Sequence, residues 1–157
     1  MLGLITHLEP RLKKKVIIGF IGEDGVGKTT ASNILAKEGF YKTSITTKVI
    51  EFASYLFSEE EIASNRETIL KEVKKRGNST YGRYWLNLVL MAIPENKNLI
   101  VIDDLGEEDI QTCTIVQPIE IIKDKQSPKD KDRMVIENSG DLKAFKEKVK
   151  MLAKKLS

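Results

Sequence analysis

Residues that build disulfide and zinc frameworks are almost absent from this sequence. The 157 residues include one cysteine, Cys113, and one histidine, His7. A single cysteine cannot form a disulfide within the chain, and one cysteine with one histidine cannot complete a Cys/His zinc site. This scarcity is typical of a reducing environment, so we expect a cytoplasmic protein.

Long apolar runs are missing as well. The longest, at 16–21 and 88–93, are far shorter than the roughly 20 residues that a membrane span requires. The N-terminal region carries Glu9 and Pro10 before Lys13, Lys14 and Lys15, and it has no apolar signal-peptide core. We therefore expect a protein that is neither exported nor bound to a membrane.

Charge of one sign is not in large excess. Lys and Arg total 26 against 23 Asp and Glu, a formal net charge of +3. This is far from the clustered basic excess of a dedicated nucleic-acid binder, and it suits small anionic ligands better. The length is that of one globular domain, so residues 1–157 are expected to form a single domain.

Short apolar runs alternate along the chain with amphipathic segments, and this alternation predicts an α/β fold with a parallel sheet. Residues 15–21 form a continuous apolar run, as expected of a strand that is buried on both faces. Further strands are expected at 98–102 and 134–137, and two brief ones within 114–122, interrupted by Gln117 and Pro118.

Helices are expected between these strands. One covers 28–38 and stops at Gly39, a second runs from a cap at Thr46 or Thr47 to Phe57, and a third opens with a capping box at Ser58 and ends at Gly77. A fourth is expected over about 81–93 and a short one over 107–111. A C-terminal helix carries an apolar stripe of Leu142, Phe145, Val149, Leu152 and Leu156. The charged segment 124–132 is expected to be an exposed, mobile loop.

The most informative pattern is a glycine-rich loop between the first strand and the first helix. Residues 22–29, GEDGVGKT, match G-x-x-x-x-G-K-[ST] in the strand and helix context that a phosphate-binding loop needs. Such a loop directs backbone N–H groups at phosphate oxygens, Lys28 would reach the β and γ phosphates of ATP, and Thr29 would bind Mg²⁺. The expected nucleotide-binding residues are Gly22, Glu23, Asp24, Gly25, Val26, Gly27, Lys28, Thr29 and Thr30.

A second element of the same site is expected at the end of the strand at 98–102. Asp103 follows this strand, where a carboxylate would face the Mg²⁺ of a neighbouring phosphate loop. Asp104 is adjacent, and side chains alternate across a strand end, so one of the two is expected to face the metal. We favour Asp103, although Asp is also a common turn residue.

Several classes of phosphate-loop protein can be compared with the sequence. A GTPase would carry N-K-x-D, whereas residues 96–99 read NKNL and precede the second expected strand. A partitioning-type ATPase has a signature lysine where this chain has Glu23. An AAA-type ATPase needs downstream elements for which 157 residues leave little room.

The nucleoside monophosphate kinases fit better, and the chain resembles compact viral and bacterial deoxynucleoside monophosphate kinases, with dephospho-coenzyme A kinases as relatives. The resemblance is carried by the phosphate loop with ASNILAKEGF at 31–40, by NRE, KRG and YGRYW at 65–67, 75–77 and 81–85, and by MVIENSGDL at 134–142. It implies a three-layer P-loop kinase fold with helices on both faces of the sheet, and a helical insert at about 44–93 that binds the phosphate acceptor. The implied reaction is ATP- and Mg²⁺-dependent phosphoryl transfer to a nucleoside monophosphate, with a deoxynucleotide favoured.

Arginine is scarce, and its placement supports this interpretation. Three of the five arginines, Arg66, Arg76 and Arg83, lie in the insert, where their rigid forks could bind the acceptor phosphate, although a solvated helix face would carry the same charges. Phe52, Tyr84 and Trp85 could stack on a base, but aromatic residues at this spacing are more often core.

The expected lid at 124–132 departs from the kinase pattern. It offers Lys125, Lys129 and Lys131, with Arg133 at its edge, and lysine supplies charge without the fork. The candidate catalytic residues are Lys28, Arg66, Arg76, Arg83 and Arg133. A degenerate phosphate-loop protein that binds or slowly hydrolyses nucleotide is therefore the alternative. The sequence leaves open the acceptor and the oligomeric state, including a homodimer. It also leaves open the role of residues 1–12, whose apolar spacing suits a packing helix.

Overall fold

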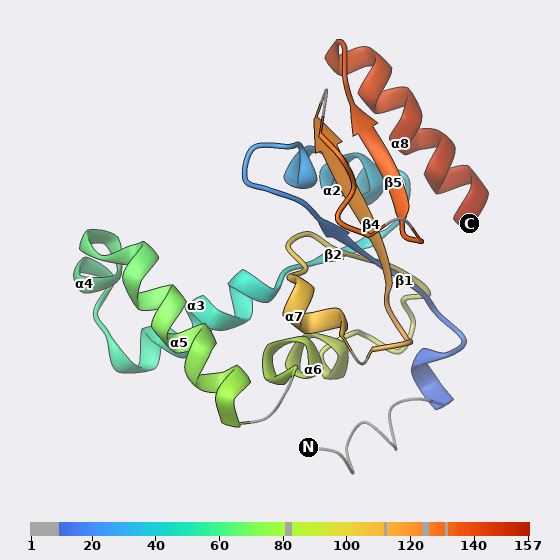
Figure 1. Cartoon of the computed structure of the whole chain (residues 1–157). Coiled ribbons are helices and arrows are strands. Elements are labelled where there is room, and N and C mark those ends of the chain that lie inside the picture. Colours follow the sequence, from blue (N-terminus) through green and yellow to red (C-terminus); the bar gives the residue numbers. More distant parts are fainter. Residues whose placement is uncertain (1–9, 81–82, 112, 124–125, 131) are drawn as a thin grey trace.

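A five-stranded parallel sheet forms the centre of the computed structural model, which describes residues 10–80, 83–111, 113–123, 126–130 and 132–157 (Figure 1). The strand order is β2-β3-β1-β4-β5, so β1 lies between β3 and β4. Every strand pair is parallel, as the alternating pattern predicts. The strands are β1 (Val16–Ile21), β2 (Tyr41–Thr43), β3 (Leu99–Ile102), β4 (Gln117–Lys123) and β5 (Met134–Asn138).

Helices cover both faces of this sheet. The helices are α2 (Lys28–Lys37), α3 (Ile45–Leu56), α4 (Glu59–Ser64), α5 (Arg66–Thr80), α6 (Tyr84–Met91), α7 (Glu107–Ile110) and α8 (Leu142–Leu156). One apolar cluster joins the sheet to α2 and α8, and a second joins its other face to α3, α5 and α6. The chain therefore has the α/β architecture with flanking helices that its sequence predicts.

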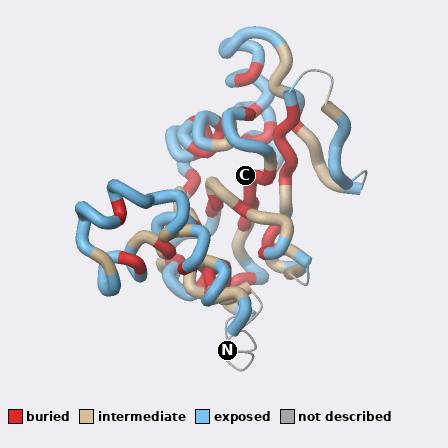
Figure 2. The backbone as a smooth tube through the Cα atoms, turned by 60° about the vertical axis from the view of Figure 1, so that its left-hand side comes forward, coloured by how far each residue is buried: buried red, intermediate tan, exposed pale blue. Residues whose placement is uncertain are grey.

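The first strand shows why the sheet is buried on both sides. Along β1, Ile18 and Phe20 belong to the cluster with α2 and α8, whereas Ile17 and Ile21 belong to the opposite cluster. This alternation follows from the two-residue period of a strand, and it requires apolar residues at every position. In Figure 2 the buried residues accordingly concentrate along the strands, while α3, α4 and α5, which together we call the arm, are largely exposed.

One prediction about strands is wrong, and one strand has no prediction. The segment 114–122 does not hold two brief strands, because β4 is a single strand that begins at Gln117 and includes Pro118. Proline is tolerated near the start of a strand, where its missing N–H removes little of the ladder. No local pattern predicts β2, a strand of three partly exposed residues that pairs with β3 at one edge of the sheet.

The helices at 44–93 also differ from expectation. Ser44 caps α3 by accepting a hydrogen bond from the Thr47 N–H at 3.3 Å, so neither Thr46 nor Thr47 is the cap. The Ser58 capping box is confirmed, but it opens the short helix α4, and α5 follows as a separate helix. Gly77 does not end α5, which continues to Thr80. The fourth expected helix is the shorter α6, and residues 81–82 lie outside the described residues.

Two aromatic residues at the start of α6, Tyr84 and Trp85, leave no room for a side chain at Gly77 of α5. A Cβ atom at Gly77 would lie 2.6 Å from Trp85 Nε1 and 2.8 Å from Tyr84 Cδ1. Gly77 therefore allows close helix packing rather than helix termination.

The remaining expectations concern the chain ends and the membrane. The helix at 142–156 is confirmed as α8, capped by Asp141, with Phe145, Val149 and Leu152 buried. Residues 126–130 have no regular helix or strand, as expected of the candidate lid. Within the described ranges, no helix is long and apolar enough to cross a membrane.

Candidate phosphate-binding site

The glycine-rich loop lies between β1 and α2, as its sequence context predicts. Gly25 and Gly27 have φ values of +80° and +114°, a left-handed conformation that disfavours other residues. Gly22 passes close to the neighbouring strand, because a Cβ there would lie 2.7 Å from the Ile121 carbonyl oxygen. Each of the three motif glycines therefore meets a local backbone requirement.

The loop ends at a helix N-terminus that is free to accept an anion. Gly27 is the N-cap of α2, and no side chain caps this helix. The first turn of α2 contains no acidic residue, so its amide groups and partial positive charge have no carboxylate competitor from that turn. Lys28 Nζ donates a hydrogen bond to the Gly22 carbonyl at 2.5 Å, which folds the ammonium group back over the loop.

Asp103 connects the end of β3 to the first turn of α2. Thr29 Oγ1 donates to Asp103 Oδ2 at 3.3 Å, and Ser32 Oγ donates to Oδ1 at 3.0 Å. The ammonium group of Lys42 lies 3.9 Å from Oδ2. Because β3 pairs directly with β1, the carboxylate and the Thr29 hydroxyl meet at one edge of the sheet, as the sequence predicts.

The neighbouring Asp104 has a different structural role. Its carboxylate accepts hydrogen bonds from the backbone N–H groups of Ile45 at 2.7 Å and Thr46 at 2.8 Å, and from the Ser44 hydroxyl at 3.1 Å. The Thr46 hydroxyl donates to the same carboxylate. Asp104 thus fixes the N-terminus of α3, and Asp103 is the aspartate that faces the glycine-rich loop.

The loop is also held from the opposite edge of the sheet. Asn138, the last residue of β5, donates through Nδ2 to the Val26 carbonyl at 2.8 Å. A Cβ at Gly27 would lie 2.9 Å from this same nitrogen, so Asn138 and Gly27 fit together only without a side chain at 27. Val26 itself is buried in the cluster with α2 and α8.

The other predicted loop residues are accessible. Glu23, Asp24, Thr29 and Thr30 are exposed. Glu23 Oε2 accepts a hydrogen bond from Gln126 Nε2 at 3.1 Å, which joins the glycine-rich loop to the candidate lid. Among the described residues, this is the one hydrogen bond between the two segments.

A cavity of about 470 Å³ lies beside the start of the loop, at the carboxyl ends of β1 and β4. In open α/β sheets, ligands bind at this edge, where the strand order reverses. The walls include the Glu23, Glu107, Glu108 and Glu120 side chains, so this part of the edge is acidic.

Arg133, predicted as a catalytic arginine of the lid, is engaged by two of these carboxylates. Its two terminal nitrogens donate to the Glu107 oxygens at 2.7 and 2.8 Å, and Nη1 also donates to Glu120 Oε1 at 3.2 Å. The guanidinium side chain is 5% exposed. Hydrogen bonding from Arg133 lowers the pKa of Glu107, and Glu107 raises the pKa of Arg133. The guanidinium therefore links α7 to β4 and does not extend over the loop.

The three arginines of the expected insert at 44–93 are not brought together. Arg66 and Arg76 lie ten residues apart on α5, a separation of about 15 Å along the helix axis. Arg83 is the N-cap of α6 and, among described non-glycine residues, the one with a positive φ, at 62°. Arg76 lines a separate apolar hollow between α3, α5 and α6, which Arg66 and Arg83 do not line.

A buried carboxylate lies between the arm and the sheet. Asp109 of α7 is 0% exposed, and its Oδ2 accepts a hydrogen bond from the Gly106 N–H at 2.8 Å. Lys74 Nζ of α5 lies 4.0 Å from Oδ2 and 3.2 Å from Glu108 Oε1, while Oδ1 has no hydrogen-bond partner. Burial raises the pKa of Asp109 to about 6, although Lys74 acts in the opposite direction.

Sequence reasoning missed Ser32, Lys42 and Asn138 as neighbours of the site. Ser32 lies three residues after Thr29 on α2, a spacing that places both hydroxyls on one helix face. That spacing was a usable signal. Lys42 belongs to the unpredicted strand β2 and had no local signal. Asn138 lies in the segment 134–142 that carries the resemblance, but its contact with the loop joins residues 112 positions apart and is not visible in the local sequence.

Oxygen ligands for a cation are available, but few. The described part of the chain has no group of three His, Cys, Asp or Glu side chains placed to hold a metal ion. Mg²⁺ commonly uses one or two protein oxygens together with phosphate oxygens and water, and the Thr29 and Asp103 oxygens fit that smaller set.

No family model matches the chain, and the search of curated proteins gave no significant match.

Proposed function

We propose that this protein is an ATP- and Mg²⁺-dependent phosphotransferase of the P-loop kinase type, acting on a nucleoside monophosphate, with a deoxynucleotide favoured. The observation that carries the proposal is the contact of Asp103 with Thr29 at the uncapped N-terminus of α2. This contact brings together amide donors, a lysine, a hydroxyl and a carboxylate. These are the groups that bind a nucleoside triphosphate and its cation. The parallel sheet of order 2-3-1-4-5 is consistent with this kind of fold.

Different residues at the loop would bind the phosphates and the cation. The backbone N–H groups of 22–29 and the Lys28 ammonium group would bind the phosphates, which requires Lys28 to leave the Gly22 carbonyl. Thr29 and Asp103 would hold Mg²⁺, which neutralises charge on the transferred phosphoryl group. The Ser32 hydrogen bond would keep the Asp103 carboxylate oriented toward the loop.

The nucleoside monophosphate as acceptor is inferred from the sequence resemblance and from the arm that follows β2. The arm is attached next to the site, because Asp104 fixes the start of α3 one residue after Asp103. Arg66, Arg76 and Arg83 remain the proposed ligands of the acceptor phosphate, and their different placement requires that each be tested separately.

A coupled assay of ADP release tests this proposal directly. The full chain with ATP and Mg²⁺ is given deoxynucleoside monophosphates, ribonucleoside monophosphates and dephospho-coenzyme A in turn. We expect ADP release to rise with one acceptor class, and to be lost in Lys28→Ala. Changing Arg66, Arg76 or Arg83 to Lys should raise the acceptor KM or lower kcat where its fork holds the phosphate, with ATP binding retained. ADP release that no acceptor stimulates would refute the transferase.

One observation favours a second candidate, a protein that binds or slowly hydrolyses nucleotide as a switch. Arg133 is bound to Glu107 and Glu120, so the arginine expected to reach the triphosphate is already paired. This candidate predicts calorimetric binding of ATP with Mg²⁺ that Lys28→Ala abolishes, and an ADP release that is slow and independent of acceptor.

A further inference from the structure

An apolar hollow of about 640 Å³ opens on the arm, between α3, α5 and the start of α6. Phe52, Leu56, Val73 and Trp85 form much of its wall, and Phe52 and Trp85 meet edge to face with ring centroids 5.8 Å apart. Next to it, α3 carries a ridge of exposed apolar side chains, Phe52, Tyr55 and Leu56, which are 45%, 87% and 64% exposed. A recess and a ridge of this kind mark an interaction surface.

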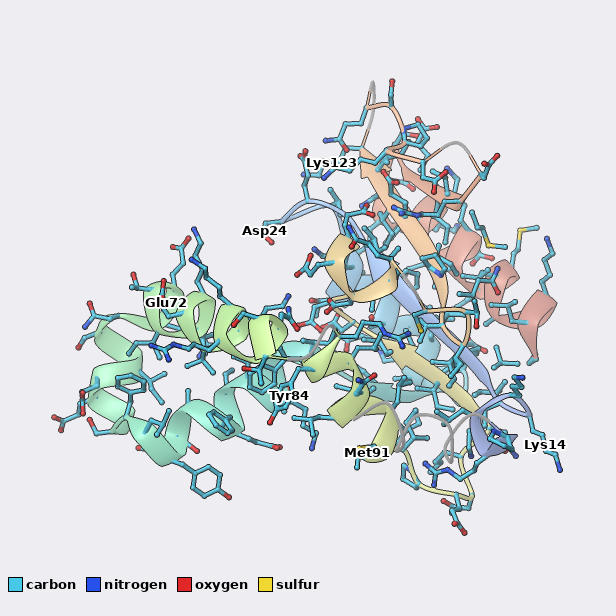
Figure 3. The ribbon with its side chains drawn as sticks, turned by 60° about the horizontal axis from the view of Figure 1, so that its bottom comes forward. Lys14, Asp24, Glu72, Tyr84, Met91 and Lys123 are labelled. Carbon is cyan, nitrogen blue, oxygen red and sulfur yellow. The ribbon has the colours of Figure 1, made fainter. Side chains whose placement is uncertain are left out.

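The hollow lies on the side of α5 that faces away from α7. At about 100° per residue, Glu72 and Arg76 each lie about 160° around α5 from Lys74, whose ammonium group contacts Glu108 and Asp109 of α7. On α3, the hollow begins at Phe52, about 10 Å along the helix from Ile45, where Asp104 anchors it. Figure 3 likewise shows Glu72 on the arm, well apart from Asp24 on the glycine-rich loop. The hollow is therefore distinct from the candidate phosphate-binding site.

Two opposite charges at the hollow have no partner within the described chain. The Glu72 carboxylate and the Arg76 guanidinium both line it, both residues are exposed, and neither group makes a hydrogen bond or ion pair with a described residue. They are four residues apart on one face of α5. This spacing is the basis for identifying the occupant.

We infer that the hollow is an interface between two copies of this chain, related by a two-fold axis through the middle of α5. Two antiparallel copies of α5 would place Glu72 against Arg76 of the partner subunit, and Arg76 against Glu72 of the partner subunit. A two-fold interface must be complementary to itself, and this surface is self-complementary in both charge and shape. It carries one acid and one base at matched spacing, and an apolar ridge beside an apolar recess.

A partner of one charge sign fits the surface less well. A basic helix would satisfy Glu72 and oppose Arg76, and an acidic segment would do the reverse. A second copy satisfies both and covers the ridge on each side. At this interface Arg76 would pair with Glu72 of the partner subunit, so the inference competes with the proposed role of Arg76 as a ligand of the acceptor phosphate. It does not depend on whether the glycine-rich loop binds nucleotide.

Charge reversal tests the interface in solution. Sedimentation equilibrium of the full chain over about a hundredfold range of concentration should show a monomer–dimer equilibrium for the wild type. Glu72→Arg and Arg76→Glu should each weaken dimerisation at least about 10-fold, because two attractive pairs become repulsive. An equimolar mixture of the two variants should form a heterodimer, and the double variant carrying both changes should dimerise again.

Matched controls separate this result from a folding defect. Lys71→Glu reverses an exposed charge on α5 that lies about 100° around the helix from Glu72 and about 140° from Arg76, and it should leave dimerisation unchanged. Circular dichroism and urea unfolding should show all variants folded. A wild type that stays monomeric throughout the range would overturn the inference and leave the hollow to another partner. So would a dimer that both single reversals leave intact, or a mixture of variants that fails to associate.

Discussion

Asn138 Nδ2 donates a hydrogen bond to the Val26 carbonyl at 2.8 Å, so the end of β5 holds the backbone of the glycine-rich loop in place. The same nitrogen leaves no room for a side chain at Gly27, where a Cβ would approach to 2.9 Å. The loop conformation therefore depends on a residue 112 positions away, on a strand that does not pair with β1.

Replacing this amide should loosen the loop. Asn138→Ala removes the side-chain donor to the Val26 carbonyl, and losing one such hydrogen bond costs about 1 kcal/mol of free energy. We expect a 3- to 10-fold weaker affinity for ATP with Mg²⁺, roughly the equivalent of that energy, measured by calorimetry. Asn96→Ala, in the exposed turn before β3, is the matched control. Equal affinities in Asn138→Ala and wild type would show that the loop holds its shape without this bond.

Substitutions of the two adjacent aspartates should have different effects, one on nucleotide binding and the other on stability. Asp103→Asn should weaken Mg²⁺-dependent nucleotide binding with little change in stability, because its carboxylate meets Thr29 and Ser32. Asp104→Ala should lower the free energy of unfolding by about 1–2 kcal/mol, because it removes the acceptor for the Ile45 and Thr46 N–H groups. Calorimetry and urea unfolding of both variants provide the comparison. A reversed pattern would assign the cation to Asp104.

Burial of Asp109 should make stability depend on pH. The unfolded chain has a pKa near 3.8 for this group and the folded chain a pKa of about 6, so the folded state binds the proton more tightly. The contribution to stability is then largest below about pH 4, declines as the pH rises to about 6, and is unfavourable above it. Asp109→Asn should therefore be more stable than wild type by about 1–3 kcal/mol at neutral pH and about equal at pH 4.

Urea unfolding across this pH range measures the difference. Glu137→Gln, an exposed carboxylate on β5, serves as the control and should show no such trend. A constant difference between Asp109→Asn and wild type at all pH values would mean that burial does not raise the pKa of Asp109.

The ion pairs of Arg133 should be structural. Arg133→Met leaves Glu120, which is 4% exposed, without its cation, and should lower the free energy of unfolding by about 3–5 kcal/mol. Adding Glu120→Gln removes the buried charge and should recover part of this loss. Thermal and urea unfolding give the measurement. If Arg133 instead serves the transferred phosphoryl group, Arg133→Met would lose turnover while its stability stayed near that of wild type.

Helix propensity and packing oppose each other at Gly77. Alanine in a helix interior is favoured over glycine by about 1 kcal/mol. The new Cβ would nevertheless lie 2.6 Å from Nε1 of Trp85, a buried side chain with little room to move. We expect Gly77→Ala to be destabilising by about 1–3 kcal/mol in urea unfolding, an overpacking effect. A stabilised variant would mean that the α5 and α6 contact is loose.

The parts of the fold that sequence predicts are those with local causes. The apolar run of β1, the spacing of Lys28 and Thr29 after the glycines, and the capping box at Ser58 each depend on a few consecutive residues. The features that the sequence does not predict depend on tertiary contacts. Gly77 lies inside a helix and packs against Trp85, and Arg133, just before β5, turns inward to pair with the buried Glu120 of β4.

Trp85 is the single tryptophan of the chain, and its place gives the protein an internal optical reporter. Its indole nitrogen donates to the Lys74 carbonyl at 2.8 Å, its ring is 1% exposed, and it forms part of the wall of the hollow. Emission from this ring reports on the junction of α5 and α6 without any added label. A red shift would record separation of α5 from α6, because that separation would expose the buried ring to water.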